Sequence, residues 1–143
     1  CVGVGVLESD LKKMTTELEL TERVHWMGYS NTIGSEISGF DLLLCLSDGE
    51  GIPINLIEAG WSGTPVLSTR VGGIPDLIPD EKYGFLVEKS DSDEWIAQKI
   101  LKAYQNQNQL RQTAEHFQSR VQSQFSEKSW IEQLSSIYTQ QLA

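Results

Sequence analysis

Short apolar runs alternate with helical patterns along most of the chain. Five runs have the right length for strands, and they cover residues 1–7, 23–27, 41–46, 65–69 and 84–88. Between and after them, apolar residues recur at intervals of three and four, as they do on the buried face of a helix. Strands that alternate with helices form βαβ units, so the sequence predicts an α/β fold in which helices flank a parallel sheet.

The third run differs from the others because apolar and polar residues do not alternate in it. Residues 42–46 read Leu-Leu-Leu-Cys-Leu, which is typical of a central strand covered by helices on both faces. Cys45 lies in this run and Cys1 in the first, and no Cys-x-x-Cys pair or His/Cys cluster accompanies them. We therefore expect both cysteines to be buried free thiols in a reducing compartment.

The helical patterns differ in strength. Leu11, Met14 and Leu18 predict a helix after the first run, whereas the residues after Asn31 predict only a short one. The later stripes are Ile54, Ile57 and Trp61; Trp95, Ile96 and Ile100 behind a polar cap at 91–93; Leu110, Ala114, Phe117 and Val121; and Trp130, Leu134, Ile137 and Tyr138 in a last helix that starts near Ser126. We interpret the three tryptophans in these stripes as packing residues.

Length and charge narrow the classes of function. The chain has 143 residues, a single-domain length, and its 20 acidic and 11 basic residues give a net charge of -9. Such a surface repels a phosphate backbone, so we expect no nucleic-acid partner. No apolar run approaches the ~20 residues of a membrane helix, and no signal peptide is visible. Because the chain begins inside a strand-like run, we interpret it as a fragment of a cytoplasmic protein.

The segment from Ser47 to Ala59 carries the most informative pattern. It follows the third run directly and so lies at the carboxyl end of a strand, where open parallel sheets bind ligands. Gly49 and Gly51 allow close approach of the backbone, and the fixed φ of Pro53 suits the first position of a helix. A helix that starts here offers unpaired amides and a partial positive charge to a diphosphate, even in an acidic protein.

Two carboxylates flank this helix start. Glu50 precedes the helix, and Glu58 lies about one and a half turns inside it. Carboxylates at the positive end of a helix would compete with phosphate, so we expect both to accept hydrogen bonds from sugar or ribose hydroxyls. A tight loop at Gly72 and Gly73 follows the next strand and is expected near the same ligand.

The chain resembles a known family at these positions. The pattern consists of Glu50, seven residues and then Glu58, followed by the motifs at 59–66 and 71–76. It is similar to the carboxyl-terminal domain of family 4 retaining glycosyltransferases of the GT-B architecture, the glycosyl transferases group 1. Residues 24–28, 84–87 and 130–138 also match. The resemblance implies a Rossmann-like domain over residues 1–143 that binds a nucleoside diphosphate sugar, with the first strand and the acceptor-binding domain before residue 1.

The resemblance also implies roles for individual residues. Glu50 is expected to be the catalytic residue that holds the sugar hydroxyls near the reacting carbon, and Glu58 to hold the ribose. The other expected donor-binding residues are Gly51, Ile52, Pro53, Ile54, Gly5, Met27, Gly28 and Tyr29. Pro53 has no amide to donate, and Met27, Gly28 and Tyr29 are candidates for contact with the nucleobase. No metal and no cofactor is implied.

Three departures from the family pattern bear on the site. Residues 3–6 read Gly-Val-Gly-Val where the family usually has Gly-Asp-Gly-Pro, so an acidic group is lost there. Arg70 stands where Asp is frequent. The Arg and Lys that neutralise the diphosphate in the family lie before residue 1.

These features predict transfer of a sugar with retention of configuration, in polysaccharide or glycoconjugate biosynthesis. The acceptor, a glycan, lipid or small molecule, is expected on the missing domain, which could also bring the protein to the inner membrane face. The fragment alone is expected to be inactive. Two alternatives remain open at this point, a nucleotide-sugar epimerase of the same architecture and a non-catalytic nucleotide-sugar-binding module.

Overall fold

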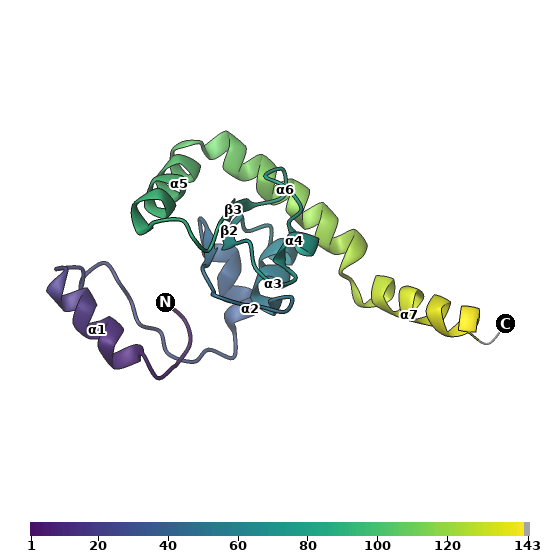
Figure 1. Cartoon of the computed structure of the whole chain (residues 1–143), viewed down its shortest axis with the longest axis horizontal. Coiled ribbons are helices and arrows are strands. Elements are labelled where there is room, and N and C mark those ends of the chain that lie inside the picture. Colours follow the sequence, from purple (N-terminus) through teal and green to yellow (C-terminus); the bar gives the residue numbers. More distant parts are fainter. Residues whose placement is uncertain (142–143) are drawn as a thin grey trace. The chain divides into compact units, whose positions relative to one another are not determined.

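The computed structural model describes residues 1–141 of the chain. The chain divides into two compact units, Cys1–Ile33 and Gly34–Ala143. The first contains helix α1 (Glu8–Glu17), and the second contains the sheet and the remaining helices (Figure 1).

The second unit is built on a three-stranded parallel sheet. Its strands are β1 (Leu43–Cys45), β2 (Val66–Thr69) and β3 (Phe85–Val87), in the order β1-β2-β3. Leu43 pairs with Val66, and Leu67 pairs with Phe85. The helices of this unit are α3 (Ile54–Ser62), α4 (Ile74–Leu77), α5 (Asp93–Gln105), α6 (Gln107–Gln124) and α7 (Glu127–Gln141), after the short α2 (Ile33–Glu36) and a 3₁₀ turn (Ile37–Gly39).

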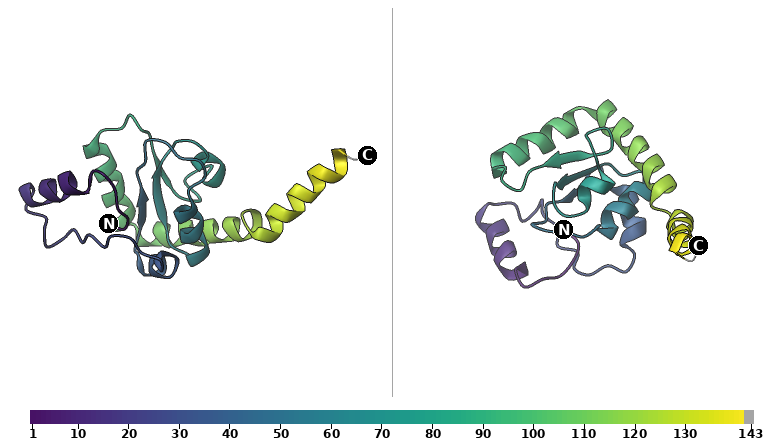
Figure 2. Two further views of the ribbon diagram at one scale, coloured as in Figure 1. Left: turned by 90° about the horizontal axis from the view of Figure 1, so that it is seen from below. Right: turned by 45° about the vertical axis from the view of Figure 1, so that its right-hand side comes forward.

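Helices cover both faces of this sheet, which confirms the predicted α/β, Rossmann-like class. On one face, Leu67, Phe85 and Val87 pack with Ala103 of α5 and Leu110 of α6. Helices α3 and α4 lie on the other side of the strands (Figures 1 and 2). Leu56 of α3, Ile74 and Leu77 of α4, and Phe117 and Val121 of α6 are fully buried there.

The run at 41–46 is a strand, but its predicted central place is wrong. β1 is an edge strand, and Leu44 and Leu46 remain 44% exposed. The central strand is β2, in which all four residues are buried. An apolar run shows that a strand is hydrophobic, whereas its place in the sheet depends on which strands pair with it.

The predicted strands at 1–7 and 23–27 are also wrong in the described structure. These segments pair over a short parallel stretch around one bridge between Val2 and Gly28. The amino group of Cys1 donates to the carbonyl of His25 at 2.7 Å, the amide of Met27 to the carbonyl of Cys1 at 2.9 Å, and the amide of Gly3 to the carbonyl of Gly28 at 2.7 Å. Gly3 has a φ of +126°, and the chain then turns into α1. Cys1 is exposed, against expectation, while Cys45 is buried as predicted.

Most predicted helices are confirmed. The stripe of α6 is buried as expected, and α5 starts behind Ser92, whose hydroxyl oxygen accepts from the Trp95 amide at 3.3 Å. The segment after Asn31 forms only a four-residue helix and a 3₁₀ turn. The interpretation of Trp61, Trp95 and Trp130 as packing residues is wrong because all three are exposed. Helical spacing indicates which residues share a face of a helix, but it does not show that another element covers that face.

Candidate functional site

The loops that follow β1 and β2 meet at the carboxyl edge of the sheet. The amide of Gly73 donates to the carbonyl of Gly51 at 2.8 Å. Gly72 has a φ of +54°, and a Cβ atom there would overlap the carbonyl oxygen of Glu50. At Gly73 a Cβ atom would lie 2.7 Å from the Gly51 oxygen. Glycine is therefore required at both positions for the backbones to touch, and this contact holds the loop that carries Glu50.

Two hydroxyl groups of β2 hold the end of β1. Thr69 Oγ1 donates to the carbonyl of Ser47 at 2.6 Å, and Ser68 Oγ donates to the carbonyl of Cys45 at 2.8 Å. Ser68 and Thr69 are both buried. The Ser68 bond reinforces the last paired residues of the two strands, and the Thr69 bond continues the link beyond them, so the loop toward Glu50 leaves the sheet from a defined position.

Helix α3 starts at this edge without a capping side chain. The sequence predicted Pro53 at the first position of the helix, but Pro53 occupies the cap position, with φ -71° and ψ 123°, and the helix begins at Ile54. The carbonyl of Pro53 accepts from the Leu56 amide at 3.2 Å. Because no side chain accepts the first-turn amides, the start of α3 presents unfilled donors and the positive end of the helix.

The two carboxylates flank this helix start as predicted. Glu50 in the loop and Glu58 on α3 are both partly buried. Glu58 lies beside the start of α2, since a Cβ atom on Gly34 would be 3.5 Å from its Oε1 atom. Within residues 1–141, neither carboxylate has an ion pair or hydrogen bond to the chain. Their oxygens are free to accept hydroxyl groups of a ligand.

The cations at this edge are already paired. Arg70 Nε lies 2.9 Å from Glu88 Oε1, and Lys89 Nζ lies 3.2 Å from Asp48 Oδ1. Lys89 also donates to the carbonyl of Asp48 at 3.3 Å, so it joins the end of β3 to the loop after β1. Sequence reasoning missed Lys89, although its place directly after a predicted strand was a signal.

The expected donor-binding residues fall in both units. Gly51, Ile52, Pro53 and Ile54 lie with Glu50 and Glu58 in the second unit, where Ile52 and Ile54 are exposed. The others belong to the first unit and are Gly5, Met27, Gly28 and Tyr29. Tyr29 is 79% exposed and Met27 is 61% exposed. Their contact with a nucleobase stays a prediction.

Metal-binding clusters and membrane-spanning helices are both absent from the described residues. No group of three or more His, Cys, Asp or Glu side chains in residues 1–141 is placed to hold a metal ion. In the same part of the chain, no helix has both the length and the apolar character needed to cross a membrane.

Comparison with known proteins decides the family. The family model described as glycosyl transferases group 1 matches residues 1–120. The chain belongs to this family. The matched residues include Glu50, Glu58 and all three strands of the sheet.

Individual relatives of this chain agree with the family assignment. N-acetyl-alpha-D-glucosaminyl L-malate synthase of Bacillus anthracis is 28% identical over 137 residues, which is 96% of this chain and 36% of that protein. The O-antigen biosynthesis glycosyltransferase WbnH of Escherichia coli is 34% identical over 113 residues, 79% of this chain and 31% of that protein. The chain thus spans about a third of the length of these relatives.

The fold also has solved counterparts. The crystal structure of Anabaena Alr3699/HepE in complex with UDP superposes with a TM-score of 0.88 at 23% identity, covering 97% of this chain and 40% of that one. At this identity the likeness concerns the fold.

Proposed function

We propose that this chain is the donor-binding domain of a retaining glycosyltransferase. The observation that carries the proposal is the edge where two unpaired carboxylates, Glu50 and Glu58, flank the uncapped start of α3. Amides serve the diphosphate there and carboxylates serve hydroxyl groups, so a nucleoside diphosphate sugar is the ligand whose chemistry matches both. The UDP bound to the similarly folded HepE supports this class of ligand.

Each group at the edge has a role in this proposal. The amides of Gly51, Ile52 and Ile54 face the sugar and the diphosphate, while Pro53 holds the turn without donating. Glu58 accepts from the ribose hydroxyls. Glu50 holds the sugar hydroxyls near the reacting carbon and stabilises the positive charge that develops there as the bond to phosphate breaks.

The proposal extends to the protein of which this domain is a part. A second domain binds the acceptor, a glycan, lipid or small molecule, and supplies cations for the diphosphate. The relative WbnH, an O-antigen biosynthesis glycosyltransferase, supports a place in polysaccharide or glycoconjugate biosynthesis. The domain alone binds nucleoside diphosphate weakly and transfers nothing, and no metal or cofactor takes part.

Transfer by the full-length protein tests the role of Glu50. Glu50→Gln should lower turnover by roughly 10²–10³, the scale of losing one preorganised electrostatic contact, while the affinity for the nucleotide changes little. Glu115→Gln, which makes the same charge change on the exposed face of α6, is the control and should keep normal turnover.

The configuration of the product tests retention in the same assay. Proton NMR of the product should show the anomeric configuration of the donor sugar. An inverted product would contradict the retaining mechanism, and near-normal turnover of Glu50→Gln would remove Glu50 from it.

A further inference from the structure

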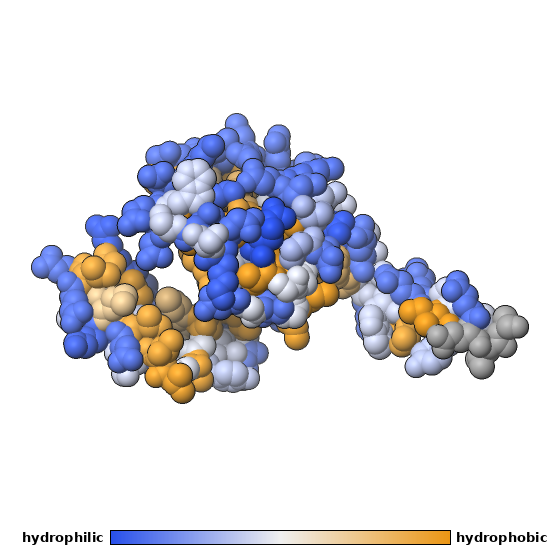
Figure 3. Space-filling view, in the orientation of Figure 1, coloured by the Kyte–Doolittle hydropathy of each residue, from blue (hydrophilic) through white to orange (hydrophobic). Residues whose placement is uncertain are grey.

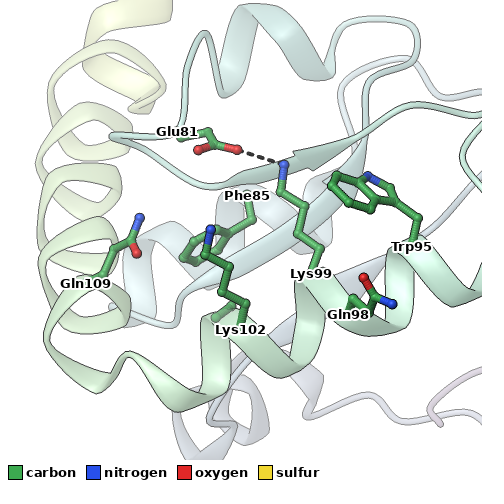
Figure 4. Close-up of a pocket in the computed structure, with 8 residues that line it drawn as sticks. Glu81, Phe85, Trp95, Gln98, Lys99, Lys102 and Gln109 are labelled. Atoms are coloured by element: carbon green, nitrogen blue, oxygen red, sulfur yellow. Dashed lines mark hydrogen bonds and ion pairs between the residues drawn. The ribbon is translucent and has the colours of Figure 1, made fainter.

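A pocket of about 390 Å³ lies between α5, the start of α6 and the loop before β3. Its volume falls within the roughly 300–1,000 Å³ of clefts that bind small molecules. Figure 4 shows Trp95, Lys99 and Lys102 projecting from α5 toward the loop that carries Glu81, while Gln109 faces them from α6. None of the residues that line it belongs to the loops around Glu50.

One side chain in this pocket has a structural role of its own. Lys99 Nζ donates to the carbonyl of Leu86 at 2.6 Å and lies 2.7 Å from Glu81 Oε1. β3 is an edge strand, so Lys99 satisfies a carbonyl on its free side and places a charge there, which discourages pairing with another strand. Lys99 and Glu81 are thereby explained without a ligand.

The other polar and aromatic groups are not explained in this way. Within residues 1–141, Lys102 has no ion pair or hydrogen bond to the chain through its side chain. Trp95 is 55% exposed although it lines the pocket. Gln98 and Gln109 add amide groups to the same wall, although Gln109 Oε1 already accepts from Asn106 Nδ2 at 3.1 Å. The surface over α5 and α6 is otherwise largely hydrophilic on the face seen in Figure 3. These groups therefore do not form part of an apolar surface for another protein.

We propose that this pocket binds a saccharide unit that carries a carboxylate. An indole ring presents a flat apolar face to the C–H groups of a pyranose, and amides exchange hydrogen bonds with its hydroxyls. The ammonium of Lys102 pairs with the carboxylate, because Glu81 already compensates the charge of Lys99. This proposal rests on the pocket alone and is independent of the donor site.

The net charge of the chain limits where an anionic saccharide can bind. A total of -9 repels an anionic saccharide over most of the surface. Binding of such a ligand therefore requires a local group of cations, and the pocket brings two ammonium groups together with a single carboxylate.

Calorimetric titration with tetragalacturonate tests the proposal, with neutral maltotetraose as the comparison ligand. The chain should bind tetragalacturonate more tightly than maltotetraose. Lys102→Gln should weaken tetragalacturonate binding by about tenfold or more through loss of a charge-assisted contact. Trp95→Ala should weaken both ligands by about three- to tenfold.

Matched variants on α7 separate the pocket from general effects of charge and exposed aromatic area. Lys128→Gln and Trp130→Ala change the same residue types at exposed positions and should bind tetragalacturonate as the wild type does. Far-ultraviolet circular dichroism checks that all four variants keep the fold. The proposal is overturned if tetragalacturonate does not bind, if maltotetraose binds equally well, or if the α7 variants lose as much affinity as those in the pocket.

Discussion

Gly72 positions Glu50 although it contributes no side chain to the site. Its φ of +54° lies in the left-handed region, and its Cα faces the carbonyl of Glu50. The sequence indicated a tight loop at this point and the two carboxylates before it, because glycines and acidic residues were visible as motifs. It did not reveal that the loop touches Glu50, nor that Lys89 joins Asp48, because these contacts connect different strands.

Gly72→Ala tests this role of the glycine. A side chain there costs at least about 1 kcal/mol for the left-handed backbone alone and displaces the Glu50 carbonyl as well. We expect a lower thermal midpoint and weaker UDP binding by the same chain. Gly39→Ala is the control, since a Cβ atom at Gly39 would meet no other atom within 4 Å, and it should change neither quantity. Equal behaviour of the two variants would show that the loop does not depend on Gly72.

At the scale of elements, α3 carries Glu58 and is held by close packing against α6. A Cβ atom at Gly60 would lie 2.5 Å from Val121 Cγ2 and 3.2 Å from Phe117 Cε1. Both side chains belong to the predicted stripe of α6 and are fully buried. The periodicity predicted each stripe because burial of one face leaves a local pattern. The closeness of the two helices at Gly60 depends on their crossing, which no local pattern records.

Gly60→Ala should therefore destabilise the domain by overpacking, by about 1–3 kcal/mol. Chemical denaturation of this variant, of Val121→Ala and of the double variant measures the effect. The shorter side chain at 121 makes room for the new methyl group, so the double variant should be more stable than the sum of the single losses predicts. Strict additivity would mean that the two positions do not meet.

The start of α5 adds a prediction about pH. The pKa of Glu94 lies below its ordinary value because its carboxylate accepts from its own backbone amide and from the Ser92 hydroxyl. Because the pKa is lower in the folded state, the charged carboxylate stabilises the fold at pH values above the ordinary pKa of a glutamate. This stabilisation is lost as the pH falls through the folded-state pKa. NMR titration should show the pKa of Glu94 rising in Ser92→Ala, and an unchanged pKa would exclude the contact with Ser92.

At the scale of the whole molecule, the fold class was predictable and the arrangement of strands was not. Alternating patterns indicate α/β folding because helices and strands bury their apolar residues with different periods. The runs at 1–7 and 23–27 carry a strand pattern, yet their pairing is limited to a short stretch in which Cys1–Gly3 meets His25–Gly28. A strand exists only where a neighbour satisfies its amides and carbonyls, and the identity of that neighbour is not contained in the run itself.

The net charge of -9 is a property of the whole molecule, and it opposes the binding of an anionic nucleotide. The proposed donor site must gain its affinity from backbone amides and from hydroxyl contacts rather than from general attraction. Glu58 is the residue at which these two sources can be separated, because it adds negative charge yet is assigned to bind the ribose.

Calorimetric titration of wild type and Glu58→Gln with UDP and with its 2′,3′-dideoxy analogue tests this assignment most directly. The wild type should prefer UDP, and the variant should lose about 10- to 150-fold in affinity for UDP, the worth of charge-assisted bonds to the ribose. The variant should also lose most of the preference between the two ligands while its thermal midpoint stays close to that of the wild type. If the ratio of the two affinities stays unchanged in the variant, Glu58 does not contact the ribose and the proposed donor site is wrong.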